Sequence, residues 1–211
     1  MTGQLPTIAI EGPCCAGKTT LAHGLVEESS ALSIEYVRDY SDHVGGGRFL
    51  PPPVPTSLAE EELILNRFLA IEADRTARIR TMTLEPDLII IDRSVHTLLA
   101  HCFALQRLLN DDYFGLARRV IGDSGVPLWP DHLLYLDTPQ CVIGARNGGK
   151  FAPDSIFIDA GFNAGVRSYF QQVAGVPSPR VVWLDASVDA TMVRRLAAAQ
   201  LVQWLERQDL R

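Results

Sequence analysis

Short runs of consecutive apolar residues recur along the chain, and most of them lack a polar residue at every second position. Such runs are typical of strands that are buried on both faces, as in a parallel sheet covered by helices. The strands that this pattern predicts are Thr7–Glu11, Ile34–Arg38, Leu88–Asp92, Leu133–Asp137 and Val181–Asp185.

Between these runs, apolar residues return every three or four positions, which is the spacing of an amphipathic helix. Strands and helices alternate throughout, a pattern that indicates right-handed βαβ crossovers. We therefore expect one α/β domain over residues 1–211, a three-layer α/β/α sandwich with a five-stranded parallel sheet. The predicted helices are Lys18–Ser29, Leu58–Thr83, Val95–Leu109, Tyr113–Ile121, Ala164–Val173 and Val188–Gln208.

Three segments interrupt this alternation. The segment His43–Thr56 is rich in glycine and then in proline, so it is predicted to be neither helix nor central strand, within an acceptor-side loop at about 39–57. The segment Gly122–Pro130 is predicted to be a turn-rich link. The segment Gly144–Gly161 is long and carries an arginine and a lysine, and long loops in compact domains are often lids.

Composition narrows the possible partners. The chain has 211 residues, and its 47% hydrophobic content is typical of a globular protein. Its formal net charge of −6 argues against a nucleic-acid polymer or an anionic membrane as partner. The four cysteines have neither disulfide-framework nor zinc-site spacing, and we expect free thiols. The start shows no basic-then-apolar leader and no apolar run approaches 18 residues, so we expect a soluble cytoplasmic protein.

The segment after the first predicted strand matches the phosphate-loop pattern G-x-x-x-x-G-K-[ST], and a predicted helix begins within it. Backbone N–H groups of such a loop surround an anion, the lysine contacts the β and γ phosphates, and the Thr19 hydroxyl is a ligand for Mg²⁺. Only two of the 19 basic residues are lysines. One of them, Lys18, is the lysine of this motif, and the other is Lys150. The predicted ATP-binding residues are Gly12, Pro13, Cys14, Cys15, Ala16, Gly17, Lys18, Thr19 and Thr20.

A second pair of charged residues follows another predicted strand. Asp92 ends the run Leu88–Asp92, and Arg93 comes next. Ligands of open parallel sheets gather at the carboxyl ends of the strands, so this pair is predicted to lie beside the phosphate loop. A carboxylate there holds Mg²⁺ or receives a proton, and an arginine there holds a phosphate.

Several segments in order resemble the thymidylate kinase family and its deoxynucleoside kinase relatives. The similarity rests on Ala73-Asp74-Arg75 followed by Leu88-Ile-Ile-Ile-Asp92-Arg93-Ser94, and it extends over nearly the whole chain. Apart from the phosphate loop, no single segment is highly specific. The other matching segments are Leu134–Pro139, Arg146 at the start of the lid, Phe162–Tyr169 and Val182–Ser187.

The resemblance implies transfer of a phosphoryl group from ATP, with Mg²⁺, to a nucleoside monophosphate or a nucleoside. It implies that Lys18 and Thr19 serve ATP and the metal, and that Asp92 acts near the metal and the acceptor. The resemblance further implies that Arg93 contacts the acceptor or the transferred group, and that Arg146, in the lid, contacts the phosphates. The predicted catalytic residues are Lys18, Asp39, Asp92, Arg93 and Arg146, and the predicted metal ligands are Thr19 and Asp92.

The acceptor side departs from the family pattern. Thymidylate kinases usually show Arg-Glu-Pro-Gly-Gly where this chain has Arg38-Asp39-Tyr-Ser-Asp, and the family's base-stacking Phe and base-reading Gln fall at Ile71 and near Cys102. In the deoxynucleoside kinase branch an acid after the second strand deprotonates a sugar hydroxyl, a role open to Asp39. The acceptor-binding residues predicted from these positions are Arg38, Asp39, Ile71, Arg75, Arg93 and His96.

Two other functions stay open at this point. One keeps the fold but transfers the phosphate to a non-nucleoside metabolite or an antibiotic. The other is a nucleotide-binding regulatory protein without transfer, which would have no need of Asp92, Arg93 and a lid arginine. The apolar helix Val95–Leu109 is suited either to a homodimer interface or to the core.

Overall fold

The computed structural model describes residues 5–29, 32–81, 86–172 and 180–208. In this part of the chain, five strands form one sheet in which every neighbouring pair is parallel, in the order β2-β3-β1-β4-β5. The central position of β1 brings the loops after β1, β2 and β3 to the same edge of the sheet. The strands are β1 (Thr7–Glu11), β2 (Ile34–Val37), β3 (Leu88–Asp92), β4 (His132–Asp137) and β5 (Arg180–Asp185).

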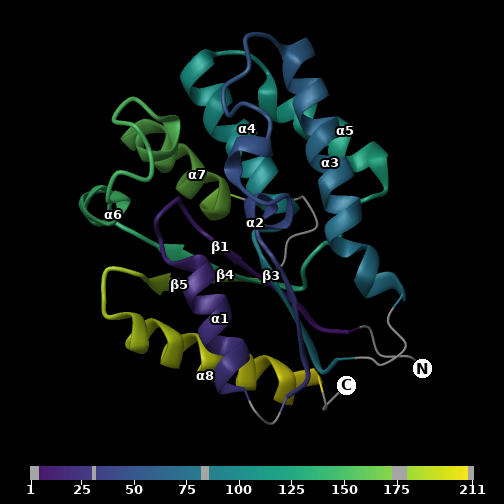
Figure 1. The fold of residues 1–211 in the computed structure, drawn as a ribbon, viewed down its shortest axis with the longest axis vertical. Coiled ribbons are helices and arrows are strands. Elements are labelled where there is room, and N and C mark those ends of the chain that lie inside the picture. The colour runs from purple at the N-terminus through teal and green to yellow at the C-terminus, as the bar shows by residue number, and fades with distance from the viewer. Residues whose placement is uncertain (1–4, 30–31, 82–85, 173–179, 209–211) are drawn as a thin grey trace.

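Helices cover both faces of this sheet, so the predicted three-layer architecture is confirmed (Figure 1). One face carries α1 and α8, and the other carries α3, α4, α5 and α7. The helices are α1 (Lys18–Glu28), α2 (Tyr40–His43), α3 (Leu58–Thr81), α4 (Val95–Leu109), α5 (Tyr113–Ser124), α6 (Gln140–Asn147), α7 (Ala160–Gln172) and α8 (Ala190–Gln208).

The continuous apolar runs are explained by a separate core on each face of the sheet. In β1, Ile8 and Ile10 face the core formed with α1 and α8, whereas Ala9 between them faces the core formed with α3, α4 and α7. All five residues of β1 and of β3 are buried. A strand covered on both faces gains from apolar residues at every position, and alternation is therefore lost.

The structure differs from the sequence prediction mainly in the loops. Helix α2 precedes the segment His43–Thr56, which was expected to lack helix, and ends at its first residue; a 3₁₀ turn, η1 (Gly47–Phe49), lies within the segment. The predicted lid begins inside α6 and contains a second 3₁₀ turn, η2 (Ile156–Ile158), before α7. These short helices lack the two or three turns over which an apolar period is visible. The predicted helix ends at Thr83 and Val173 lie outside the described residues.

Helix α4 lies inside the molecule and not on an open face. It packs against α5 and α7, and eight of its residues, from Val95 to Leu105, are buried. Most of its apolar residues thus belong to the core, although Leu108 and Leu109 at its end are exposed, and the homodimer stays a prediction. No helix among the described residues is both long and apolar enough to cross a membrane.

Candidate active site

The phosphate loop joins β1 to α1 with the backbone shape that its glycines permit. Gly12 has φ 137° and Gly17 has φ 94°, a region that favours glycine. A Cβ on Gly12 would also lie 2.8 Å from the carbonyl oxygen of Leu136 on β4. This close approach explains why a residue without a side chain begins the loop.

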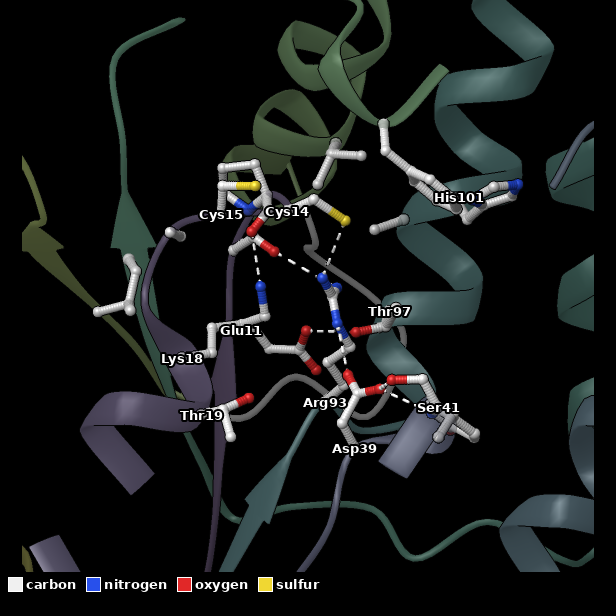
Figure 2. A pocket seen from close by; sticks show the side chains of 18 of the residues that line it. Glu11, Cys14, Cys15, Lys18, Thr19, Asp39, Ser41, Arg93, Thr97 and His101 are labelled. Carbon is white, nitrogen blue, oxygen red and sulfur yellow. Dashed lines mark hydrogen bonds and ion pairs between the residues drawn. The ribbon is translucent and has the colours of Figure 1, made fainter. Parts of the chain in front are cut away.

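The lysine of the motif is buried at the centre of the loop. Its side chain is 6% exposed, and its Nζ donates a 2.6 Å hydrogen bond to the carbonyl oxygen of Pro13 (Figure 2). Burial, with the charge of Arg93 adding, lowers the pKa of Lys18 to about 8. Below that pH the ammonium group is charged, as a ligand for phosphates must be.

Asp92 and Thr19 meet at the sheet edge beneath the loop. The Thr19 hydroxyl donates a 2.5 Å hydrogen bond to Oδ2 of Asp92, while Oδ1 of Asp92 is buried without a hydrogen-bond partner among the described residues. Burial raises the pKa of this carboxyl group. A buried oxygen without a partner is costly, and a hard cation held by one hydroxyl, one carboxylate, phosphates and water would satisfy it. The two residues therefore fit Mg²⁺.

A Mg²⁺ ion at Thr19 and Asp92 would be bound largely by the phosphates of the substrate and by water. Among the described residues, no group of three or more His, Cys, Asp or Glu side chains is arranged to hold a metal ion. Mg²⁺ in phosphoryl-transfer sites commonly keeps its waters and uses one or two protein ligands, so the small donor set suits it.

Arg93 and Asp39 form an ion pair although they follow different strands. Nε of Arg93 lies 2.8 Å from Oδ2 of Asp39, and the same guanidinium contacts the Gly12 carbonyl oxygen at 3.5 Å and Sγ of Cys14 at 3.4 Å. Arg93 has φ 63°, which is strained for a residue with a side chain. Figure 2 shows its side chain reaching from β3 between the phosphate loop and Asp39.

Asp39 is held ionised in this position. Its Oδ1 accepts hydrogen bonds of 2.7 Å from both the backbone N–H and the hydroxyl of Ser41 at the start of α2. Burial opposes ionisation, but the charge of Arg93 and the bonds from Ser41 outweigh it, so the pKa of Asp39 is lowered. An ionised carboxylate beside the phosphate loop can accept a proton from a hydroxyl group.

Glu11 was not singled out from the sequence, yet it organises the site. Its carboxylate is buried and accepts hydrogen bonds from the N–H and hydroxyl of Ser94, at 2.8 and 2.7 Å, and from the hydroxyl of Thr97 at 2.6 Å. It thereby attaches the start of α4 to the end of β1 and fixes Arg93 between them. A carboxylate that ends a buried strand is the signal that identifies such a residue.

These groups open onto one cavity of about 940 Å³, except Asp92, which is fully buried behind Thr19 and does not line it. All nine predicted loop residues, Gly12 to Thr20, line it, as do Asp39 and Arg93. Two lid-side cations also line it, Arg146 and Lys150, and the Arg146 Nη1 donates to the carbonyl oxygen of Ala16 at 3.4 Å. The cavity continues past Arg93 between α3 and α4.

Four predicted acceptor residues are not brought to this cavity. Arg38 is exposed elsewhere, and Ile71 packs against the core. Arg75 is 5% exposed and fully engaged by protein groups, with Glu72 and the carbonyl oxygens of residues 38, 92 and 93 as acceptors. His96 is buried, with Nδ1 2.8 Å from the hydroxyl of Tyr169.

For two of these four residues, Ile71 and His96, a nearby residue on the same helix lines the cavity instead. Phe68, one helical turn before Ile71, is the aromatic side chain of α3 that lines the cavity, and His101 lines it from α4 in place of His96. Cys102, near which the base-reading Gln of the thymidylate kinase family falls, lines it too. Burial lowers the pKa of His101 to about 4, so this ring is neutral at pH 7. Phe68 lies one turn before Ile71 on the same face of α3, so an aromatic residue one turn from the expected position was the usable sequence signal.

A five-stranded parallel sheet with a phosphate loop between its central strand and first helix defines the fold of P-loop kinases, which the sequence predicted. Solved structures share it. Deoxyadenosine kinase from M. mycoides is 17% identical with a TM-score of 0.67, over 92% of this chain and 98% of its own. Thymidylate kinase from Candida albicans is 18% identical with a TM-score of 0.64, over 98% of this chain and 93% of its own.

At these identities the similarity establishes the fold of the thymidylate and deoxynucleoside kinases. No protein-family model and no curated protein sequence matches the chain.

Proposed function

We propose that this protein is an ATP-dependent kinase that transfers the γ-phosphoryl group to a hydroxyl of a nucleoside. The observation that carries the proposal is the ion pair of Asp39 and Arg93 beside the phosphate loop, on the wall of the shared cavity. A carboxylate for the hydroxyl proton and a cation for the moving phosphate are the two groups that phosphoryl transfer to a hydroxyl requires.

The donor nucleotide is assigned to the phosphate loop. The loop amides and the first turn of α1 hold the phosphates, and Lys18 is buried at their centre. Arg146 and Lys150 face the same space from the lid side and supply positive charge as negative charge spreads over the transferred group. Thr19 and Asp92 would hold Mg²⁺, which when bound neutralises phosphate charge.

The acceptor hydroxyl is assigned to Asp39. This carboxylate orients the hydroxyl and takes its proton as the oxygen attacks the γ-phosphorus and the bond to the β-phosphate oxygen breaks. Arg93 keeps Asp39 ionised and contacts the phosphate loop through the Gly12 carbonyl, so it bridges donor and acceptor. ADP and a phosphorylated acceptor are the products.

A neutral acceptor is favoured over a nucleoside monophosphate by the state of the arginines. An acceptor phosphate needs free cations, but Arg75 is committed to four protein acceptors and Arg38 does not line the cavity. Arg93 is already paired with Asp39. The fold is shared by a nucleoside kinase and a nucleotide kinase, so it does not decide between them.

ADP release in the presence of ATP and Mg²⁺ tests the proposal, with nucleosides, nucleoside monophosphates and hydroxylated small metabolites as acceptors. The variant Lys18→Ala is the blank. Release that depends on a nucleoside supports the assignment. Release only with monophosphates would assign the site to a nucleotide kinase, and release only with another metabolite would replace the nucleoside as acceptor.

A further inference from the structure

The part of the cavity beyond Arg93 is largely apolar, with one buried carboxylic acid in its wall. The carboxylic acid is Glu61 of α3, which is 2% exposed. Burial raises the pKa of its carboxyl group, and no ion pair to it is found in the described part of the chain. The apolar lining around it includes Ile64, Leu65, Phe68, Phe157 and Phe162.

Only one side of this carboxyl group is occupied. Sγ of Cys102 donates a 3.0 Å hydrogen bond to Oε1, and within the described ranges Oε2 has no hydrogen-bond partner. Both Glu61 and Cys102 line the cavity. Glu61 is largely buried, and a carboxyl oxygen held there without a partner is costly, so a ligand in the cavity that donates a hydrogen bond to Oε2 would compensate.

Glu61 has no evident structural task, in contrast to its two neighbours. Glu60 accepts hydrogen bonds from the N–H and hydroxyl of Thr56 and thereby caps the start of α3. Glu62 points outward, with Arg119 at 3.7 Å. Three consecutive glutamates thus have three different environments, and only the middle one enters the cavity.

The two helices that line the cavity place Glu61 at a distance from the reacting groups that a nucleoside can span. On α4, the Thr97 hydroxyl bonds to Glu11 beside Arg93, and Cys102 bonds to Glu61 five residues later. At a rise of about 1.5 Å per residue, Thr97 and Cys102 lie roughly 7.5 Å apart along the helix axis. On α3, the Phe68 ring contacts the ring of Tyr40, the residue after Asp39, and Phe68 lies nearer to this edge than Glu61 does. An acceptor with its hydroxyl at Asp39 therefore passes Phe68 before its far end contacts Glu61.

We infer that Glu61, supported by Cys102, reads the end of the acceptor opposite its reacting hydroxyl and selects a nucleoside whose base carries an amino group there. The amino N–H donates to Oε2 of the ionised carboxylate, to which Cys102 already donates, whereas a carbonyl oxygen at the same place faces another acceptor oxygen and is rejected. A flat base suits the space beside Phe68, since aromatic rings stack favourably on one another. This inference rests on the proposed nucleoside kinase function.

Matched pairs of nucleosides that differ only in this group provide the test. Deoxycytidine is compared with deoxyuridine, and deoxyadenosine with deoxyinosine, by kcat/KM for phosphorylation and by Kd from calorimetry. The wild-type protein is expected to prefer the amino member of at least one pair by about 10- to 100-fold, because rejecting a partner of the wrong polarity has effects of that size.

Glu61→Gln preserves the shape of the side chain, and its amide offers a donor as well as an acceptor. The preference is expected to fall to within about threefold in this variant. Glu62→Gln, on the same helix but outside the cavity, is expected to keep it. Thermal unfolding of each variant establishes that it is folded.

Two kinds of failure are distinguishable. If the wild-type protein phosphorylates nucleosides without preferring an amino base, or if Glu61→Gln keeps the preference, the role of Glu61 is wrong and the kinase proposal stands. If the wild-type protein neither phosphorylates nor binds any nucleoside, the nucleoside proposal and the inference both fail.

Discussion

The carboxylate of Asp39 and the guanidinium of Arg93 lie 2.8 Å apart, although 54 positions separate them, from 39 to 93. The parallel pairing of β2 with β3 brings them together, because residues that follow neighbouring parallel strands emerge at the same edge. The charge of Arg93 lowers the pKa of Asp39 and so keeps the carboxylate ionised. In turn, the ion pair with Asp39 orients the Arg93 guanidinium toward the phosphate loop.

Replacing Asp39 by Asn removes the proton acceptor and leaves the size of the side chain unchanged. We expect kcat to fall by about 10²- to 10⁴-fold, the usual contribution of general acid–base catalysis, with a smaller effect on the acceptor KM. Steady-state kinetics with saturating ATP measure both. Asp74→Asn removes an exposed carboxylate on α3 and is expected to leave kcat unchanged; an equal loss there would contradict a specific role for Asp39.

The lowered pKa of Lys18 predicts how ATP affinity depends on pH. The ammonium group is charged below about 8 and neutral above it, so ATP binding is expected to weaken as pH rises through that value. The loss should approach tenfold per pH unit, on the order expected when only the protonated form binds. Titration calorimetry measures it. Lys18→Arg stays charged and should lose this dependence; the same profile in both proteins would assign it to another group.

Arg146 is expected to act on the transition state more than on bound ATP. Arg146→Ala should lower kcat by about 10²- to 10³-fold, as removal of a preorganised electrostatic donor commonly does, and change the Kd of ATP little. Arg195→Ala on α8 removes an exposed arginine as the control. A large loss of ATP affinity without a change in kcat would make Arg146 a binding residue only.

Arg75 is expected to stabilise the fold. Arg75 and Glu72 form a buried ion pair, with side-chain exposures of 0% and 1%. Arg75→Met leaves Glu72 buried and uncompensated, which should lower the free energy of unfolding by about 3–5 kcal/mol. Arg119→Met, in an exposed pair, should cost less than about 1 kcal/mol. Urea unfolding measures both, and a stable Arg75→Met protein with a raised acceptor KM would restore the acceptor role.

The sequence predicted the fold because each buried strand is a short continuous apolar run and each long helix has an apolar period of its own. The run Leu88–Asp92 and the helix Val95–Leu109 were predicted with the bounds that the structure has. The phosphate loop was equally readable, since its glycines and lysine have fixed spacing. Helices such as α2 and α6 were missed because they have at most eight residues.

The acceptor side was harder to predict because it depends on which turn and which face of a helix meet the cavity. Ile71 lies one turn after Phe68 on the same face of α3, and only Phe68 lines the cavity; His96 and His101 lie on different faces of α4, and only His101 lines it. Arg75 has the charge of a phosphate ligand, yet its contacts are with backbone carbonyls, which leave no trace in a sequence. Residue type alone does not separate a structural arginine from a binding one.

The most direct test of the central assignment is to identify which molecule receives the phosphate. The protein is incubated with ATP labelled at the γ-phosphate, Mg²⁺, and each nucleoside or its 5′-monophosphate, and the labelled products are separated by mass. Label on a nucleoside hydroxyl, absent with Asp39→Asn and Lys18→Ala, is the predicted result. Label that appears only on nucleoside monophosphates would contradict the assignment of Asp39 to a hydroxyl acceptor.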